Sequence, residues 1–242
     1  MPRVLGVTMP YRNMTLAELA RHIGMDAREA RRLADRGVLP GHLIGGEWRF
    51  NRTQMLEWFQ REMHTLDERH LRNLERAMSG GPAAPGFSTL LPPEAVDMSL
   101  RARSKASVLR ELVALAERSG LVYDRGAIVA ALEEREELCS TGLAGGFAFP
   151  HPRRPLPYAL SESLLCLARV PGGVPFGAPD GRLTDLFVLV CAQEEREHLK
   201  TLARLSLMFH RADLAARLRD AESNDEALKI VLIAERDALA SD

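Results

Sequence analysis

One histidine in this sequence, His151, is placed where an imidazole could act as a nucleophile. It follows Gly145-Gly146-Phe147-Ala148-Phe149-Pro150, so little side chain surrounds it, and Pro150 restricts the backbone just before it. A neutral imidazole nitrogen is nucleophilic, and the ordinary histidine pKa of about 6.5 leaves the ring neutral near pH 7. This placement is what a phosphoryl acceptor requires. The alternative is a loop histidine with no chemical role.

Backbone groups, rather than a metal, are the expected stabilisers of a phosphoryl group here. The N–H groups of Gly145 and Gly146 can approach phosphate oxygens without a side chain in the way. The sequence has no CxxC pair and no cluster of cysteine and histidine. We therefore expect neither a metal nor a cofactor.

The composition describes a globular chain without a membrane segment. Of its 242 residues 46% are hydrophobic and 27% are charged, with a net charge of −1. The longest apolar stretches are broken by charge well before the ~20 residues that span a bilayer, and no signal peptide opens the chain. Its three widely spaced cysteines suit reduced thiols, and Cys139 is expected to be buried. These features predict a cytoplasmic protein without membrane insertion.

A break in composition at residues 79–86 divides the chain. Small residues, glycine and proline replace helix formers there, as in an interdomain linker. We expect one domain over residues 1–66 with a helical extension to 78, and a second over residues 87–242. Before the linker, thirteen arginines face ten acidic residues, so the first domain is the one to test for nucleic acid.

The first domain shows the pattern helix, turn, helix, hairpin, helix. Thr15 and Glu18 have the spacing of a capping box, and Asp26 opens a second short helix that ends at Gly37. Two alternating runs over residues 42–50 flank a Gly-Gly turn and predict a hairpin. A third helix is expected from about residue 51 almost to the linker. Its apolar positions are a candidate homodimer seam, although no heptad repeat is sustained.

This part of the sequence resembles helix-turn-helix modules of the excisionase and mercury-resistance-regulator type. The resemblance is carried by Thr15-Leu16-Ala17-Glu18-Leu19-Ala20, Arg36-Gly37-Val38-Leu39-Pro40, Trp48-Arg49-Phe50 and Gln54-Met55-Leu56-Glu57-Trp58-Phe59. Such modules place the second helix in the major groove and the wing on the backbone. The implied DNA-binding residues are Arg28, Arg31 and Arg32 of the second helix with His42 and Arg49 of the wing. The alternatives are a solvated arginine face and a protein adaptor.

After the linker, helices and strands alternate. Helices are expected over residues 104–118, 124–137, 195–209, 212–219 and 224–234, and strands over residues 163–170 and 183–192. Such alternation predicts an α/β domain with helices on both faces of one mixed sheet.

This second domain resembles the enzyme IIA domain of the fructose and mannitol class of the bacterial phosphotransferase system, including its nitrogen-regulatory branch. The matching segments cover nearly all of residues 87–238 and are Leu90-Leu91-Pro92-Pro93-Glu94, Ser104-Lys105, Val108-Leu109-Arg110-Glu111-Leu112, 134–151, Phe176-Gly177-Ala178-Pro179-Asp180-Gly181 and 198–205. Where the family has a small glycine after the acceptor, this chain has Pro152-Arg153-Arg154-Pro155. The two arginines there could add positive charge at the site.

The resemblance implies a phosphohistidine relay. The phosphorylated histidine-containing carrier protein would donate a phosphoryl group to His151, beside a second histidine, His198, and an arginine, Arg135. These two would stabilise charge on the phosphoryl oxygens. Ser140 and Thr141 would add hydroxyl donors, and the acceptor ring is expected to be exposed. The remaining histidines without a motif are expected to be surface or packing residues: His22, His64, His70 and His210.

The favoured function is that of a regulatory protein in which the phosphorylation state of His151 tunes DNA or partner binding. It would be a phosphoryl carrier rather than an enzyme that turns over a small molecule. The first alternative is a IIA component that passes phosphate to a separate sugar permease. The second is a binding or adaptor protein that is never phosphorylated.

Overall fold

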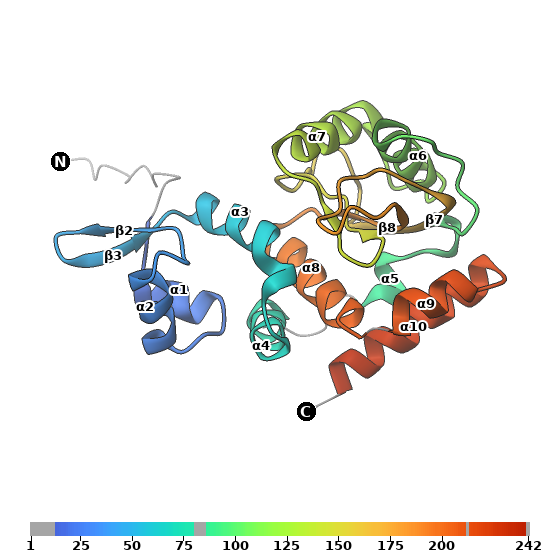
Figure 1. Cartoon of the computed structure of the whole chain (residues 1–242). Helices are drawn as coiled ribbons and strands as arrows, with labels where there is room; N and C mark the ends of the chain where they lie inside the picture. Colours follow the sequence, from blue (N-terminus) through green and yellow to red (C-terminus); the bar gives the residue numbers. More distant parts are fainter. Residues whose placement is uncertain (1–12, 80–85, 212, 241–242) are drawn as a thin grey trace.

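The structure is a computed structural model, and it describes residues 13–79, 86–211 and 213–240. Within these residues a small N-terminal lobe with a three-stranded sheet projects from a larger unit with a five-stranded sheet (Figure 1). The predicted linker at 79–86 falls mostly on residues 80–85, which lie outside the described residues. The polypeptide first reaches the larger unit through one helix, α3 (Arg52–Glu62).

The small lobe forms as its sequence predicts. Thr15 accepts a hydrogen bond from the Glu18 N–H while the Glu18 carboxylate bonds back to Thr15, so the predicted capping box is present. Asp26 caps the second helix through the N–H groups of Arg28 and Glu29. The sheet is antiparallel in the order β1-β3-β2. The elements are β1 (Met14–Thr15), α1 (Leu16–His22), α2 (Ala27–Asp35), β2 (Gly41–Ile44) and β3 (Glu47–Phe50).

The prediction of one long third helix is wrong. Helix α3 ends at Glu62, a 3-10 turn covers Met63–Thr65, and a separate helix α4 (Glu68–Ser79) follows. Asp67 accepts a hydrogen bond from the His70 N–H at 2.9 Å, which is the bond that an N-cap makes at the start of a helix. The short polar side chain of Asp67 therefore starts a new helix in the middle of a pattern that is helical on both sides.

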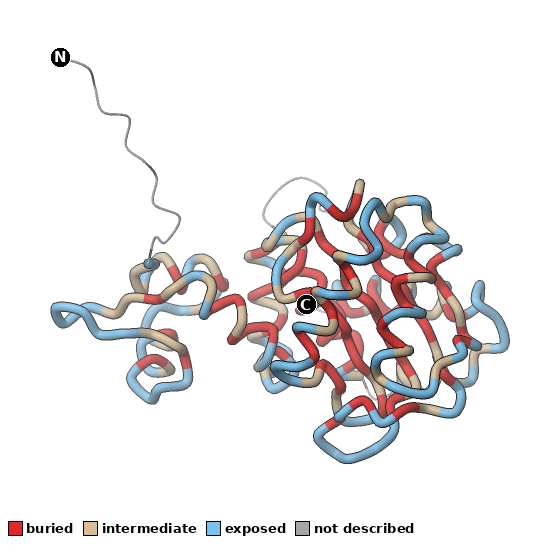
Figure 2. Tube along the Cα trace, turned by 90° about the horizontal axis from the view of Figure 1, so that it is seen from above, coloured by how far each residue is buried: buried red, intermediate tan, exposed pale blue. Residues whose placement is uncertain are grey.

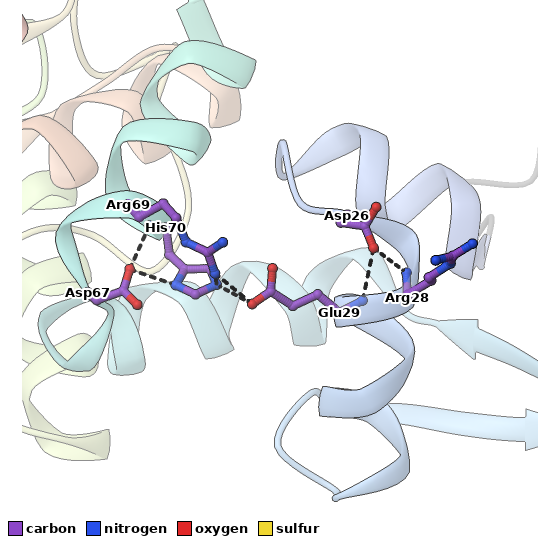
Figure 3. Close-up of polar contacts among 6 residues, drawn as sticks. All are labelled: Asp26, Arg28, Glu29, Asp67, Arg69 and His70. Carbon is purple, nitrogen blue, oxygen red and sulfur yellow. Dashed lines mark hydrogen bonds and ion pairs between the residues drawn. The ribbon is translucent and has the colours of Figure 1, made fainter. Parts of the chain in front are cut away.

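Helix α4 holds the small lobe in place. A Cβ added at Gly24, just after α1, would lie 2.4 Å from the Asn73 carbonyl oxygen, and Gly24 has a φ of +65°, so only glycine fits this approach. On α2, Glu29 bonds to Arg69 at 2.9 Å and to His70 at 3.0 Å, while the other His70 nitrogen meets Asp67 (Figure 3). His70 is therefore a bridge between two helices.

The larger unit is the expected α/β domain. Its sheet is mixed, in the order β4-β7-β8-β6-β5, with parallel pairs β4–β7 and β6–β8. Helices α6 and α7 lie over one face, and α8 lies with α10 beneath the other (Figure 1). The strands are β4 (Val96–Asp97), β5 (Gly142–Leu143), β6 (Phe147–Ala148), β7 (Leu164–Val174) and β8 (Thr184–Cys191). The helices are α5 (Phe87–Leu90), α6 (Lys105–Glu117), α7 (Arg125–Leu138), α8 (Glu195–Phe209), α9 (Asp213–Asp220) and α10 (Asn224–Ala240).

The core lies between these helices and the two long strands. All but one of the eight residues of β8 are buried, and Figure 2 shows buried backbone concentrated in the larger unit. A strand covered on both faces needs apolar residues at successive positions, as in Leu186-Phe187-Val188-Leu189-Val190. Helix α8 is buried along most of its length because α4 packs on it as well.

Buried charges join α4 to the larger unit. The Arg204 guanidinium of α8 bonds to Glu75 of α4 and to Glu235 of α10, each at 2.6 Å, and all three residues are buried. Removing one partner from such a buried group leaves an uncompensated charge. The apolar residues that the sequence assigned to a dimer seam, Leu71 and Leu74 among them, are buried within the chain itself. That side of α4 is not available to a second copy.

Candidate functional site

The candidate acceptor His151 lies just beyond β6 on a segment that is tied to the sheet. The Val190 N–H donates to the Pro150 carbonyl at 2.9 Å, and His151 Nδ1 lies 2.7 Å from the Phe149 carbonyl oxygen. A carbonyl oxygen can only accept, so Nδ1 must carry the proton of this hydrogen bond. In the neutral ring, Nε2 then keeps its lone pair, and Nε2 has no hydrogen-bond partner among the described residues.

His198, near the start of α8, lies against His151. The two ring centroids are 5.2 Å apart, with an angle of 65° between the rings. His198 Nε2 lies 2.8 Å from the amide nitrogen of Gln60, a residue of α3, the helix that leads from the small lobe to the larger unit. The same amide nitrogen donates to the Arg153 carbonyl at 3.1 Å, and this contact fixes the orientation of the amide. Gln60 therefore donates to His198 Nε2, so Nδ1 carries the ring proton.

Arg135 enters the site from α7. Its Nη1 donates to the Cys139 carbonyl at 2.7 Å, which holds the guanidinium at the end of its own helix. Arg135 and His151 both line a cavity of about 220 Å³. The structure therefore brings together the three residues that the sequence groups as acceptor and charge stabilisers.

The environment keeps both histidines uncharged. Burial, then the neighbouring His198 and Arg135, hold the pKa of His151 well below its ordinary value. Burial and Arg135 lower the pKa of His198 to about 4. Both rings are therefore neutral near pH 7, which is the state in which His151 Nε2 is a nucleophile. Burial also lowers the pKa of Arg135, although an arginine remains charged at any ordinary pH.

The predicted hydroxyl donors are engaged elsewhere. Ser140 donates to the Phe176 carbonyl at 2.8 Å, and the hydroxyl and N–H of Thr141 both bond to the Glu136 carboxylate. Glu136 in turn pairs with Lys105 at 2.9 Å. Both Ser140 and Thr141 line the cavity, so their contacts shape its wall.

The glycines assigned to phosphate binding do not line this cavity. The Gly145 N–H donates to Asp180 at 2.9 Å, and the Gly145 carbonyl accepts from Arg219 at 2.7 Å. Both glycines have positive φ values, +98° at Gly145 and +83° at Gly146. Their conformational freedom serves the turn between β5 and β6.

The predicted exposure of the acceptor ring is wrong. His151 is 3% exposed and His198 is 1% exposed, because Gln60 and its neighbours in the small lobe lie over them. The prediction that Cys139 is buried is also wrong, since Cys139 lies at the end of α7 and is exposed. Arg153 donates to the Glu57 carboxylate of α3 through its Nε at 2.9 Å and through Nη2, so its guanidinium is paired with α3.

Sequence reasoning missed the contribution of α3 and the turn after it. Gln60, Arg61, Met63 and His64 line the same cavity as His151 and Arg135. Nothing in the local sequence marks these residues, because the site they complete lies about ninety positions later in the chain. Only the break at Asp67, which turns α4 onto α8, would have indicated that α3 lies against the second domain.

The candidate DNA-binding residues are on the outer surface of the small lobe. Arg28, Arg31, Arg32 and His42 are exposed. Arg49 is half-buried, and Glu47 binds it at 2.6 Å. One arginine of each element is thus paired with a carboxylate, Arg49 with Glu47 in the wing and Arg31 with Asp35 at 3.9 Å in the second helix.

Neither a cluster of metal-ligating side chains nor a membrane-spanning helix is present among residues 13–79, 86–211 and 213–240. No group of three or more histidine, cysteine, aspartate or glutamate residues there could hold a metal ion. In the same ranges, no helix has the length and apolar character needed to cross a membrane.

The chain is similar to several named proteins over about 60% of its length. A 26% identical solved structure, the nitrogen regulatory protein IIA-Ntr of Neisseria meningitidis, aligns with a TM-score of 0.55 over 60% of this chain and 98% of that one. The nitrogen regulatory protein of Bradyrhizobium diazoefficiens is 34% identical over 60% of this chain and 94% of its own length. The fructose-specific EIIABC component of Bacillus subtilis is 28% identical over 60% of this chain, but the match spans only 23% of that protein.

Family comparisons cover both parts of the chain. A helix-turn-helix domain matches residues 14–63. The family described as phosphoenolpyruvate-dependent sugar phosphotransferase system, EIIA 2, matches residues 89–233, which is more than half of the chain. The chain therefore belongs to the EIIA type-2 family of this phosphotransferase system and carries a helix-turn-helix domain ahead of its IIA domain.

Proposed function

We propose that this chain is a phosphoryl-carrying regulatory protein that accepts a phosphoryl group on Nε2 of His151 from the phosphorylated histidine-containing carrier protein. The observation that carries the proposal is the unpartnered Nε2 of a neutral imidazole beside His198 and Arg135. Its helix-turn-helix domain would convert the phosphorylation state into DNA or partner binding. The division into domains at 1–66 and 87–242 is part of this proposal.

The transfer itself needs no base. The lone pair of His151 Nε2 forms the new N–P bond while the N–P bond of the donor breaks, and its electron pair returns to the donor ring. Because the proton of His151 lies on Nδ1, Nε2 has none to lose. Arg135 and the Nδ1–H of His198 would stabilise charge on the phosphoryl oxygens.

Two further features support a regulatory role. The curated relatives include a protein named for nitrogen regulation, and this chain covers 94% of its length. In helix-turn-helix domains the second helix meets DNA, and the arginines of the second helix, α2, are exposed in this chain. Since one side of α4 is occupied within the chain, a homodimer on two half-sites would form through another surface. Reduced thiols at the buried Cys166 and Cys191 suit the cytoplasm, which we propose as the compartment.

A sugar-transport role is the second candidate, because a relative of the IIA domain is named as a fructose-specific component of the phosphotransferase system. In that role the chain would pass its phosphoryl group to a separate permease, and the arginines of α2 would have no partner. DNA binding therefore separates the two candidates.

Incubation with the phosphorylated carrier protein should add one acid-labile phosphoryl group per chain, measured by intact mass. We expect His151→Ala to abolish the label and His42→Ala, on the exposed wing, to keep it. Arg135→Gln should slow labelling on the order of 10²–10³-fold, because one charge stabiliser is lost. Labelling that survives in His151→Ala would contradict the proposal.

The free energy of unfolding should fall in acid because buried neutral histidines resist protonation. The unfolded chain binds more protons than the native chain between the ordinary pKa of about 6.5 and the value of about 4 for His198. From about pH 7 to about pH 4.5, urea unfolding should show the native protein losing about 2–3 kcal/mol more than His198→Gln. Equal losses in the two proteins would show that His198 is not held neutral.

Gel shifts on duplex DNA at several salt concentrations should test the helix-turn-helix domain. Arg28→Ala/Arg32→Ala should weaken binding and lower the salt slope by about two, since each phosphate contact contributes about one. Arg101→Ala/Arg103→Ala removes the same charge from an exposed loop of the IIA domain and should leave the slope unchanged. Equal behaviour of the two double variants would favour the transport role.

A further inference from the structure

The phosphoryl acceptor is covered by the chain's own N-terminal lobe. Residues 57–64, which run from the second half of α3 into the turn after it, are called the cover segment below. Gln60 of this segment bonds to His198 and to the Arg153 carbonyl, and Glu57 bonds to the Arg153 guanidinium. These contacts come from a domain that other proteins of the IIA fold do not need in order to fold, since the match to IIA-Ntr covers 98% of that chain.

In this structure the atom that would accept the phosphoryl group, His151 Nε2, is not accessible to another protein. In a reacting pair the donor phosphorus must approach the nucleophile to about 3–3.5 Å. His151 Nε2, however, is fully buried in the structure. The cavity beside it is walled on one side by Gln60, Arg61, Met63 and His64 of the cover segment. A carrier protein that presents its own histidine would have to occupy the space that these side chains fill.

We propose that the cover segment and the carrier protein compete for the same face of the IIA domain, so that phosphorylation of His151 requires the cover segment to leave. This inference rests on the proposed function, because it names the control of that same site. A phosphoryl group bonded to Nε2 would in turn keep the cover segment off, since it would take the space now closed by the segment.

The negative charge of a phosphoryl group on His151 would also favour release of the cover segment. A phosphoryl group brings about −1.5 to −2 charges to a site two residues from Arg153. It therefore competes with the Glu57 carboxylate for the Arg153 guanidinium and repels that carboxylate. The Glu57–Arg153 pair is half-exposed, with 34% and 37% of the two side chains accessible, so it is a contact that can exchange partners without unfolding the core.

Movement of the cover segment would also displace the small N-terminal lobe. Helix α3 begins two residues after the last residue of β3 in the wing, so its displacement shifts the wing. Helix α4 would stay in place, because Arg204 holds Glu75 in the buried ion cluster. The contacts of Glu29 with Arg69 and His70 then form the joint across which α2 would change its position relative to the IIA domain (Figure 3).

The test is to release the cover segment without touching the acceptor. Glu57→Lys places two positive charges against each other at the Arg153 contact. It should raise the initial rate of phosphorylation by the carrier protein on the order of tenfold, equivalent to about 1.4 kcal/mol less stability of the closed state. Glu62→Lys makes the same change on the same helix at a residue whose carboxylate, among the described residues, pairs with the neighbouring Arg61 and not with the IIA domain, and it should keep the native rate.

The double variant Glu57→Lys/Arg153→Glu restores the pair with its charges exchanged. Because Arg153 lies beside the phosphoryl site, this variant is read by the accessibility of His151 to diethyl pyrocarbonate, which should return to the native value. It separates release of the cover segment from misfolding and from a changed attraction for the carrier protein. A Glu57→Lys rate equal to the native rate would overturn the inference.

A second readout keeps this inference apart from the proposed function. Diethyl pyrocarbonate modifies accessible neutral imidazole, and peptide mass mapping locates it. Modification of His151 should be slow in the native protein and faster in Glu57→Lys. If Glu57→Lys accelerates modification of His151 but no variant accepts a phosphoryl group, the result supports a cover segment that can be released and contradicts the proposed phosphoryl function. If all variants are phosphorylated at the native rate and modified at the native rate, the result supports the phosphoryl function and contradicts the inference that the cover segment controls access to His151.

Discussion

The hydrogen bond from His151 Nδ1 to the Phe149 carbonyl is the interaction on which the site depends. It assigns the ring proton to one nitrogen and leaves a lone pair on the other. Burial reinforces this assignment, because removing the ring from water disfavours its charged form. Pro150 and the Val190 N–H hold the segment that carries both partners, so the orientation of the nucleophile is set by the sheet rather than by a flexible loop.

The same burial ties the site to the N-terminal lobe. His151 and His198 are both buried beside Gln60, an amide that also fixes the tautomer of His198. The two domains are therefore not independent units on a tether. Helix α4 is fastened to the IIA domain by buried charge, and α3 is fastened over the acceptor by a half-exposed pair. This difference in burial is the reason why we propose that the α3 contact opens while the α4 contact holds.

The sequence predicted the parts whose signals are local. The capping box at Thr15, the strands of the buried sheet and the convergence of His151 with His198 and Arg135 all follow from short patterns or from the family resemblance. The break at Asp67 was missed because apolar residues recur at helical intervals on both sides of it. Gln60 was missed because its partners lie in another domain. Gly145 and Gly146 were assigned to phosphate because no side chain obstructs their N–H groups, whereas Asp180 and Arg219 bind their backbone groups.

The most direct measurement of the central claim is the protonation state of the His151 ring, read by NMR from the two ring nitrogens of protein labelled with ¹⁵N-histidine. Near pH 7, the structure predicts a neutral ring with its proton on Nδ1 and an unprotonated Nε2. A charged imidazolium, or a neutral ring protonated on Nε2, would contradict the account because no lone pair would remain on Nε2, the atom that we propose as the phosphoryl acceptor.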